Sequence, residues 1–224
     1  MKRCCACKLQ LPHDAFYPAR NRRDGLQTIC RVCNQKRYQN NKQYFYRINK
    51  ENRARLKIVV DEIRSTTPCT DCGIQYEPFC MDFDHTGPKL RAVAHMVHDT
   101  FSLKHILQEI AKTEIVCVLC HKTRTYERFW NRGQPNAAQL RNRAILLSEK
   151  NKPCAECGSS RLPWQMEFDH IDPDNKRQSI SLMAVTCYSE KALRAEIIKC
   201  RVVCTLCHRR KSVAQMRETS SGLI

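Results

Sequence analysis

The 224-residue sequence has little that would build flexible linkers, with only six glycines and nine prolines. It also lacks any apolar run long enough to cross a bilayer, the longest being short patches such as residues 144–147. The first ten residues hold three cysteines and no apolar signal core, which argues against secretion. We therefore expect a cytoplasmic protein with no membrane partner.

Acidic residues are scarce relative to basic ones. Asp and Glu number 22 against 39 Lys and Arg, which gives a formal net charge of +17. A chain this basic favours an anionic partner, above all nucleic acid. Hydrophobic residues make up 42% of the chain and charged residues 27%, a balance that excludes a wholly disordered chain.

Cysteine, by contrast, is abundant. Sixteen cysteines in a chain without a signal core argue for metal sites, with disulfides as the minority alternative. Twelve of them form six Cys-x-x-Cys pairs, whose two-residue spacer lets both thiolates bind one tetrahedral Zn²⁺. Taken in chain order, the pairs predict about three structural Cys4 zinc sites: Cys4, Cys7, Cys30 and Cys33; Cys69, Cys72, Cys117 and Cys120; and Cys154, Cys157, Cys204 and Cys207.

Four cysteines lie outside these pairs: Cys5, Cys80, Cys187 and Cys200. We expect them to pack as small buried hydrophobic residues. Cys5 could compete with Cys4 for the first site, but only Cys4 has the two-residue spacing to Cys7.

The second and third cysteine groups belong to an internal duplication. Residues 68–73 match residues 153–158 at an offset of 85, and the run Met-Asp-Phe-Asp-His at 81–85 matches Met-Glu-Phe-Asp-His at the same offset. After a two-residue insertion, residues 117–121 match a second segment at an offset of 87. The chain therefore carries two copies of one module, and residues 133–136 form the clearest boundary between them.

We expect an α+β fold of small zinc-stabilised modules. The expected parts are an N-terminal Cys4 zinc finger over residues 1–36, a basic linker helix over 37–64, a first module over 65–132 and a second over 137–224. In each module the Met-x-Phe-Asp-His run alternates like a strand, and a basic helix follows the last cysteine pair. A shorter helix over residues 137–150 leads into the second module.

The basic helix, read over residues 35–64, has two interpretations of equal weight. Its apolar positions have roughly helical spacing, which is typical of a solvated linker helix that packs by one stripe: Phe45, Ile48, Leu56, Val59 and Ile63. Its many Lys and Arg residues indicate contact with DNA instead.

An aspartate–histidine pair ends the expected strand in each module: Asp84-His85 and Asp169-His170. A further histidine directly follows the last cysteine: His121 and His208. Because each Cys4 cluster ties the strand end to the helix start, we expect the pair and the later histidine to meet. A carboxylate and an imidazole can then bind a divalent cation while the neighbouring histidine takes a proton from water, which suits phosphodiester hydrolysis. The alternative is that these histidines are surface groups or extra zinc ligands.

The acidic residues two positions before each aspartate, Asp82 and Glu167, are weaker candidates for an orienting role. On a strand they point to the same side as the aspartate.

Each module resembles an HNH endonuclease (ββα-metal, or His-Me finger) of the zinc-bound kind common in phages, related to the endonuclease VII group. The resemblance rests on Cys69-x-x-Cys72, Phe83-Asp84-His85 and Cys117-x-x-Cys120-His121, and on the equivalent set in the second module. It implies two tandem ββα-metal units and an HNH-type endodeoxyribonuclease, with Mg²⁺ or another divalent cation as cofactor. It also implies a location in the host cytoplasm if a phage encodes the chain.

The resemblance assigns the site residues as well. The metal ligands it implies are Asp84, His121, Asp169 and His208, and the general bases are His85 and His170. Many HNH proteins place an Asn five residues before the second cysteine pair, where this chain has Lys112 and Lys199. The sequence therefore leaves open what orients each general base. An endonuclease VII-like protein would also have Asn at the positions of His121 and His208.

Basic residues just beyond the expected metal ligand are predicted to meet the phosphates that flank the cut: Lys122, Arg124, Arg128, Arg209, Arg210 and Lys211. Such contacts position a protein on DNA without reading its sequence. A solvated basic helix face is nearly as good an interpretation of any one of them.

The main rival function is a non-catalytic zinc-finger protein that binds DNA or regulates, with relic HNH motifs. A nuclease that acts on RNA is a third alternative. The intact set of one aspartate and two histidines in both modules favours the enzyme. Two sites in one chain could form a covalent pseudo-dimer that cuts both DNA strands as a monomer, or one module could only dock the DNA.

Overall fold

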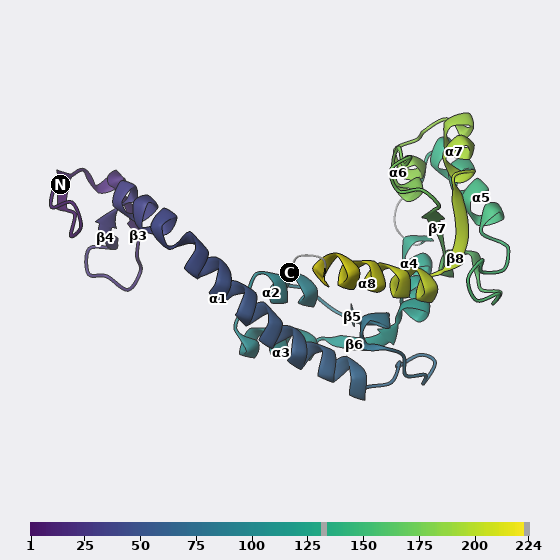
Figure 1. Cartoon of the computed structure of the whole chain (residues 1–224), viewed down its shortest axis with the longest axis horizontal. Helices are drawn as coiled ribbons and strands as arrows, with labels where there is room; N and C mark the ends of the chain where they lie inside the picture. Colours follow the sequence, from purple (N-terminus) through teal and green to yellow (C-terminus); the bar gives the residue numbers. More distant parts are fainter. Residues whose placement is uncertain (131–133, 222–224) are drawn as a thin grey trace. The chain divides into compact units, whose positions relative to one another are not determined.

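The computed structural model describes residues 1–130 and 134–221 (Figure 1). The chain divides into two compact units, one of residues 1–57 with 97–101 and the other of residues 58–96 with the described residues from 102 onward. Helices and small antiparallel hairpins build them, so the fold is a mixed α+β one. Part of the predicted boundary at 133–136, and the last residues of both predicted modules, lie outside the described residues.

The first unit begins with two short hairpins. Strand β1 (Lys2–Arg3) pairs with β2 (Gln10–Leu11), and β3 (Phe16–Pro18) pairs with β4 (Leu26–Cys30) after a 3-10 helix over His13–Ala15. Their core consists of little more than buried Cys4, Phe16 and Cys30. A core this small cannot hold the hairpins together without a further crosslink, which the cysteine cluster can provide when it binds metal.

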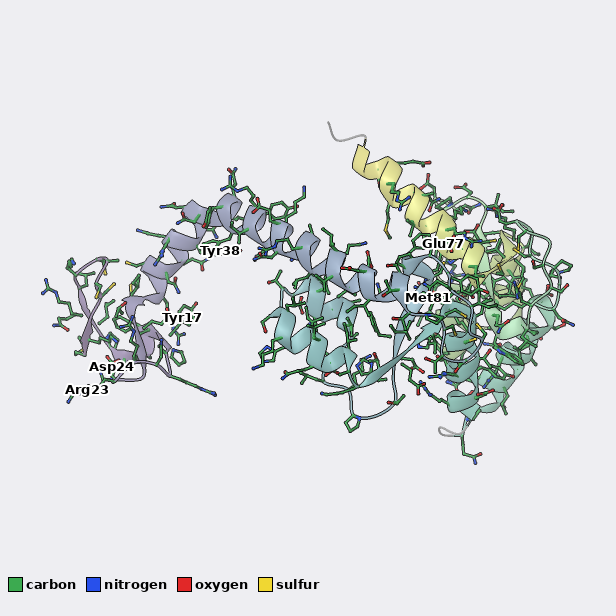
Figure 2. The ribbon with its side chains drawn as sticks, turned by 90° about the horizontal axis from the view of Figure 1, so that it is seen from below. Tyr17, Arg23, Asp24, Tyr38, Glu77 and Met81 are labelled. Carbon is green, nitrogen blue, oxygen red and sulfur yellow. The ribbon has the colours of Figure 1, made fainter. Side chains whose placement is uncertain are left out.

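Helix α1 (Arg31–Thr66) follows β4 without a break. The predicted basic helix is confirmed, but it starts earlier, inside the segment assigned to the zinc finger. Residues 35–47 are exposed on every side of the helix, and side chains such as Tyr38 project from it in Figure 2. The predicted apolar stripe is therefore wrong at Phe45 and begins only at Ile48. No helix within residues 1–130 and 134–221 is both long and apolar enough to cross a membrane.

The second unit contains the two copies, which we call repeat 1 (Cys69 to the end of α4) and repeat 2 (Cys154 to the end of α8). In repeat 1, β5 (Met81–His85) pairs antiparallel with β6 (Thr113–Cys117), and α4 (Val118–Trp130) follows at once. In repeat 2, β7 (Met166–His170) pairs with β8 (Cys200–Cys204), and α8 (Thr205–Ser221) follows. The predicted strands and the basic helices are thus confirmed in both repeats.

Each repeat inserts two short helices between its strands. They are α2 (Val93–His98) and α3 (Leu103–Ile110) in repeat 1, and α6 (Ile180–Val185) and α7 (Glu190–Ile197) in repeat 2. Serine side chains cap α3 and α7 by accepting a backbone N–H of the first turn. Single-turn 3-10 helices precede β5 and β7, over Pro78–Cys80 and Pro163–Gln165.

The predicted helix before repeat 2 is also present, as α5 (Ala137–Glu149). Asn136 and Gln139 form a capping box at its start, which explains why the helix begins there. Its residue Ile145 packs with α6 and α7 in a cluster that includes Met183 and Leu193.

The two repeats share one hydrophobic core. Met81 and Val116 of repeat 1 belong to the same buried cluster as Met166 and Val203 of repeat 2. The rings of Tyr126 in repeat 1 and Trp164 in repeat 2 also stack, with centroids 4.1 Å apart. Because the core is shared, a change that unfolds one repeat is expected to destabilise the other.

The four cysteines outside the pairs behave differently from one another. Cys80 is fully buried and Cys200 is partly buried, as predicted. Cys5 and Cys187 are exposed, so the prediction is wrong for them. Cys5 occupies the turn between Cys4 and Cys7, and Cys187 has a φ of 60° in the turn between α6 and α7.

Candidate functional site

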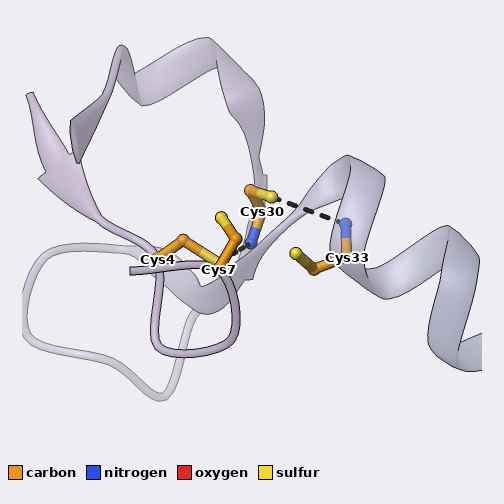
Figure 3. A group of neighbouring side chains, drawn as sticks. All are labelled: Cys4, Cys7, Cys30 and Cys33. Carbon is orange, nitrogen blue, oxygen red and sulfur yellow. Dashed lines mark hydrogen bonds between the residues drawn. The ribbon is translucent and has the colours of Figure 1, made fainter. Parts of the chain in front are cut away.

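Three groups of four cysteines bring their sulfur atoms together, and they are the groups that the sequence predicts. Within each group every sulfur lies within 4.8 Å of the other three, and Figure 3 shows the first group, in which Cys4 and Cys7 face Cys30 and Cys33. Zn–S bonds of about 2.3 Å in a tetrahedron place the sulfurs about 3.8 Å apart. In the second group the sulfur atoms of Cys72 and Cys117 lie 3.9 Å apart. The donor sets therefore fit zinc, and the three groups could hold about three zinc ions.

The first cysteine pair of each group sits on the same backbone turn. The residue after the pair has a φ of 63° at Lys8 and of 69° at Gly73 and Gly158. Its N–H donates to the carbonyl of the first cysteine at 2.8–2.9 Å. Glycine suits this left-handed position in the repeats, because it has no side chain to strain there.

Backbone N–H groups also point at the sulfur atoms. The Cys30 N–H donates to the Cys4 sulfur at 3.3 Å and lowers the pKa of Cys4 to about 6. Conversely, the neighbouring sulfur of Cys30 raises the pKa of Cys33 to about 12. Adjacent thiols cannot all ionise without a cation between them, which is the chemistry of a Cys4 metal site.

In repeat 1 the structure brings both predicted metal ligands together. Asp84 lies near the end of β5, and His121 lies in the first turn of α4, directly after Cys120. The His121 Nε2 atom is 3.6 Å from the Asp84 carboxylate, while its Nδ1 atom hydrogen-bonds to Asp82 at 2.8 Å. Asp82 thus holds the ring so that Nε2 faces Asp84, which is the place expected of an orienting residue.

Repeat 2 places the same pair in a more open setting. The His208 Nε2 atom is 3.9 Å from the Asp169 carboxylate. Glu167, the counterpart of Asp82, forms ion pairs with Lys122 at 2.5 Å and Lys150 at 4.0 Å instead. A pocket of about 310 Å³ opens here, lined among others by Asp169, His170, His208 and Lys211.

The sequence analysis missed a buried glutamate beside each predicted general base. His85 Nε2 is 3.0 Å from Glu109 on α3, and His170 Nε2 is 2.9 Å from Glu196 on α7. Both glutamates are at most 2% exposed. An ionised carboxylate in this position accepts the ring N–H and thereby fixes the tautomer of the histidine.

Interactions around the glutamates keep them ionised. Lys112 donates to Glu109 at 2.8 Å and, with the backbone N–H of Leu90, lowers its pKa to about 2. In repeat 2, burial alone would raise the pKa of Glu196, but Lys199 and the Arg177 N–H outweigh burial and lower the pKa to about 2. Lys112 and Lys199, at the positions where the sequence comparison with HNH proteins expected Asn, are thus linked through a glutamate to the histidines predicted as general bases. The only signal of these glutamates in the sequence is that Glu109-Ile110 and Glu196-Ile197 match at the same offset of 87 as the second cysteine pairs.

All six cations predicted to contact DNA form ion pairs within the chain. Lys122 pairs with Glu167, Arg124 with Asp71, Asp84 and Glu114, Arg128 with Asp84, Arg209 with Asp82, Arg210 with Glu77, and Lys211 with Asp169. Their charges are thus balanced where they stand. DNA contact by these residues stays a prediction, and it would require several of these pairs to open.

The predicted metal-ligand aspartates are themselves surrounded by cations. Burial would raise the pKa of Asp84, but Arg128 and Arg124, at 2.7 Å and 2.9 Å, outweigh burial and hold it below the usual range. Asp169 is held below the usual range in the same way by Lys211 at 2.7 Å and Arg201 at 3.0 Å. Both carboxylates are therefore ionised at neutral pH and able to bind a cation.

Two ion pairs cross between the repeats in a reciprocal way. Arg209 of repeat 2 donates two hydrogen bonds, of 2.9 Å and 3.0 Å, to the carboxylate of Asp82 in repeat 1. Lys122, the counterpart of Arg209, reaches from repeat 1 to Glu167, the counterpart of Asp82, in repeat 2. Such an exchange of equivalent residues is typical of an interface with two-fold symmetry.

The comparisons with known proteins do not assign a family. No family model matches the chain, and neither the curated proteins nor the solved structures give a match. The function must therefore be argued from the geometry of the two sites alone.

Proposed function

We propose that the chain is a metal-dependent DNA endonuclease with one HNH-type site in each repeat. The observation that supports this best is a set of contacts that recurs in both repeats: an ionised aspartate faces one histidine, and the histidine next to that aspartate in the chain is bound to a buried glutamate. Strand, helix and cysteine cluster position this set twice. A protein that only binds nucleic acid has no need of a buried carboxylate behind each histidine.

The donor set fits a hard divalent cation. Asp84 and His121 would hold it in repeat 1, and Asp169 and His208 in repeat 2. Carboxylate oxygen is a suitable ligand for Mg²⁺ or Mn²⁺, and imidazole nitrogen is a common ligand of transition-metal ions; water and phosphate would fill the remaining positions. When bound, the cation would offset the charge of the phosphodiester and of the leaving oxygen.

The histidine of each Asp-His pair would act as the general base. Because Glu109 accepts the Nε2–H of His85, the Nδ1 atom is left with a lone pair. Nδ1 then takes a proton from the attacking water, the water oxygen bonds to phosphorus, and the bond to the leaving oxygen breaks. The same assignment applies to His170 and Glu196 in repeat 2.

We also propose that the two repeats act as a covalent pseudo-dimer. The shared core and the reciprocal ion pairs of Arg209 and Lys122 support this arrangement. Antiparallel DNA strands are themselves related by two-fold axes, so two sites related in this way suit the cutting of both strands.

A non-catalytic zinc protein is the second candidate, and one observation favours it. Asp84 and Asp169 each have two cationic side chains within 3.0 Å, which satisfy these carboxylates without a metal ion. If those cations are permanent partners, the motifs are relics.

Plasmid cleavage separates the two candidates. The purified chain should nick and linearise supercoiled plasmid with Mg²⁺ or Mn²⁺ but not with EDTA at a concentration that leaves the zinc in place. The variant His85→Ala with His170→Ala should lose cleavage by about 100-fold to 10,000-fold and keep its affinity for DNA. His98→Ala with His105→Ala, which changes exposed histidines outside the sites, is the matched control. No cleavage by the wild type with either metal, despite intact zinc sites and DNA binding, would support the relic interpretation.

A further inference from the structure

The positive charge of the chain is concentrated in a quarter of its length. Residues 1–57 contain fifteen Lys and Arg against three Asp and Glu, a net charge of +12, whereas residues 58–224 contain 24 against 19, a net charge of only +5. The repeats that hold the candidate sites are thus close to neutral for their size. Most of the net charge that would attract nucleic acid therefore lies in residues 1–57.

Most of this charge lies on one exposed part of α1. Residues 31–57 carry nine Lys and Arg and a single acidic residue, Glu51. At about 100° per residue, seven of the nine fall within roughly 160° of the helix circumference: Arg31, Lys36, Lys42, Arg47, Lys50, Arg53 and Lys57. We call this the basic face of α1.

Unlike the six cations of the repeats described above, three lysines of the basic face have no ionic partner among the described residues. Lys36, Lys42 and Lys50 are exposed and form no ion pair with any residue of 1–130 and 134–221. Arg47 has only a 3.9 Å contact with Glu51, both of them more than half exposed. A contact of this kind is weak and does not hold either side chain in place. Adjacent unpaired cations repel each other, and an anionic partner removes this repulsion.

Aromatic rings border the basic face. Tyr46 is 69% exposed and lies within the arc of cations, and Tyr44 and Tyr38 are also about half exposed. Tyr38 stacks on Phe45 with ring centroids 6.2 Å apart. Tyrosine hydroxyl groups donate to phosphates and sugars in protein–DNA contacts, so the rings extend the same surface.

We propose that the basic face of α1 is the main docking surface for duplex DNA, and that the repeats contribute cleavage rather than affinity. The choice of DNA over other polyanions rests on the proposed function. The docking surface itself rests on the distribution and the pairing of charge. The phosphate backbone of DNA matches the basic face, because the phosphate charges are closely spaced over a length that corresponds to several turns of α1.

A charge-matched pair of variants tests this surface in the full-length chain. The α1 variant is Lys36→Gln with Lys42→Gln and Lys50→Gln, and glutamine keeps the helix propensity. The control is Lys104→Gln with Arg161→Gln and Lys191→Gln, which removes the same charge from exposed positions of the repeats. Circular dichroism and zinc content verify that both variants are folded. The readout is fluorescence anisotropy with a 30-base-pair DNA duplex over a series of salt concentrations.

Each lysine on a phosphate contributes about 1 to the slope of log K against log salt. The α1 variant should therefore lower the slope by about 3 and the control by less than 1. Equal losses in the two variants would overturn the proposal, as would tighter binding of polyglutamate or of duplex RNA than of DNA. Cleavage tested on the same samples keeps the two proposals apart. If the α1 variant lowers the salt-dependence slope but the wild type never cuts DNA, the nuclease proposal is refuted and the docking surface is not. If the wild type cuts DNA but the α1 variant binds DNA as tightly as the wild type, only the docking surface is refuted.

Discussion

Repeat 1 and repeat 2 hold the same aspartate, histidines and buried glutamate on equivalent strands and helices, but the charges around them differ. In repeat 1, Asp84 lies opposite Glu114 in the hairpin and forms ion pairs with two arginines of α4. In repeat 2, the residue across the hairpin from Asp169 is Arg201. The chemical groups proposed to act on substrate are thus constant, while their surroundings have diverged.

A second difference concerns how much each site depends on the other repeat. In repeat 1 the orienting Asp82 binds His121 on one side and Arg209 of repeat 2 on the other. In repeat 2 the equivalent Glu167 forms no hydrogen bond or ion pair with His208 within the described residues, and it pairs with two lysines instead. The acidic residue beside the predicted metal ligands thus links its own histidine to the other repeat in repeat 1, whereas in repeat 2 it contacts only lysines.

Loss of a zinc site should have the largest effect and should erase the difference between the repeats. We expect about three zinc ions per chain by elemental analysis. Cys69→Ser and Cys154→Ser should each remove one ion and unfold both repeats together in a thermal melt, because the core is shared. Cys5→Ser, at an exposed cysteine outside the groups, should keep all three ions. Three ions retained in Cys154→Ser would be incompatible with the assigned ligands.

Removal of a buried glutamate should have the next largest effect, and it should be equal in the two repeats. Glu109→Gln and Glu196→Gln should each slow cleavage at their own site by about 10-fold to 100-fold, as expected when a partner that orients a site residue is lost. Each is measured with the other repeat inactivated by His170→Ala or His85→Ala. Glu62→Gln, at an exposed position of α1, is the control. An unchanged cleavage rate in both variants would show that the glutamates do not orient the proposed general bases.

The same glutamate makes a pH-dependent contribution to stability. Lys112 and the Leu90 N–H lower the pKa of Glu109 from 4.5 to about 2, so the ionised form stabilises the folded chain above pH 4.5. This contribution is lost as the pH falls from 4.5 toward 2. The difference in unfolding free energy between wild type and Glu109→Gln should therefore shrink over that interval, as measured by urea denaturation. A difference that stays constant from pH 5 to pH 3 would contradict the assigned ion pairs.

Breaking the cross-repeat pairs should expose the dependence of repeat 1 on repeat 2. Arg209→Gln should slow cleavage at repeat 1 about fivefold, because Asp82 loses a partner that holds it against His121. The reciprocal Lys122→Gln should leave cleavage at repeat 2 nearly unchanged. Arg210→Gln, which breaks only the exposed pair with Glu77, serves as the control. Equal effects of Arg209→Gln and Lys122→Gln would show that the repeats depend on each other symmetrically.

The smallest effect should come from making one site resemble the other. Arg128 of repeat 1 corresponds to Gln215 of repeat 2. The Arg128 guanidinium forms an ion pair with Asp84 at 2.7 Å. Arg128→Gln should lower the Mn²⁺ concentration for half-maximal cleavage at repeat 1 about threefold, because one competing cation is removed. Metal binding measured by calorimetry should shift in the same direction. A higher Mn²⁺ requirement would mean that Arg128 supports the site.

Local pattern was enough to predict much of this architecture. The spacing of the cysteines fixed the three clusters, and alternation in the Met-x-Phe-Asp-His run indicated β5 and β7. The roughly helical spacing of apolar residues over 35–64 indicated α1. The meeting of Asp84 with His121 also followed, because the cluster ties the strand to the helix.

What the sequence could not provide depends on contacts between distant segments. Glu109 reaches His85 only because α3 packs beside the hairpin, and no local spacing reports that packing. The partners of Arg209 and Arg124 are set by tertiary structure, so a run of cations that looked free is in fact paired. The exposure of Phe45 likewise depends on what surrounds α1 and not on its periodicity.

The central claim is that two working sites act in one chain, and a time course on supercoiled plasmid tests it most directly. The wild type is compared with His85→Ala, with His170→Ala and with the double variant, at one enzyme and metal concentration. Two working sites predict that each single variant nicks the plasmid but linearises it poorly, and that the double variant does neither. One fully active single variant alongside an inactive one would contradict the claim and identify the only catalytic repeat.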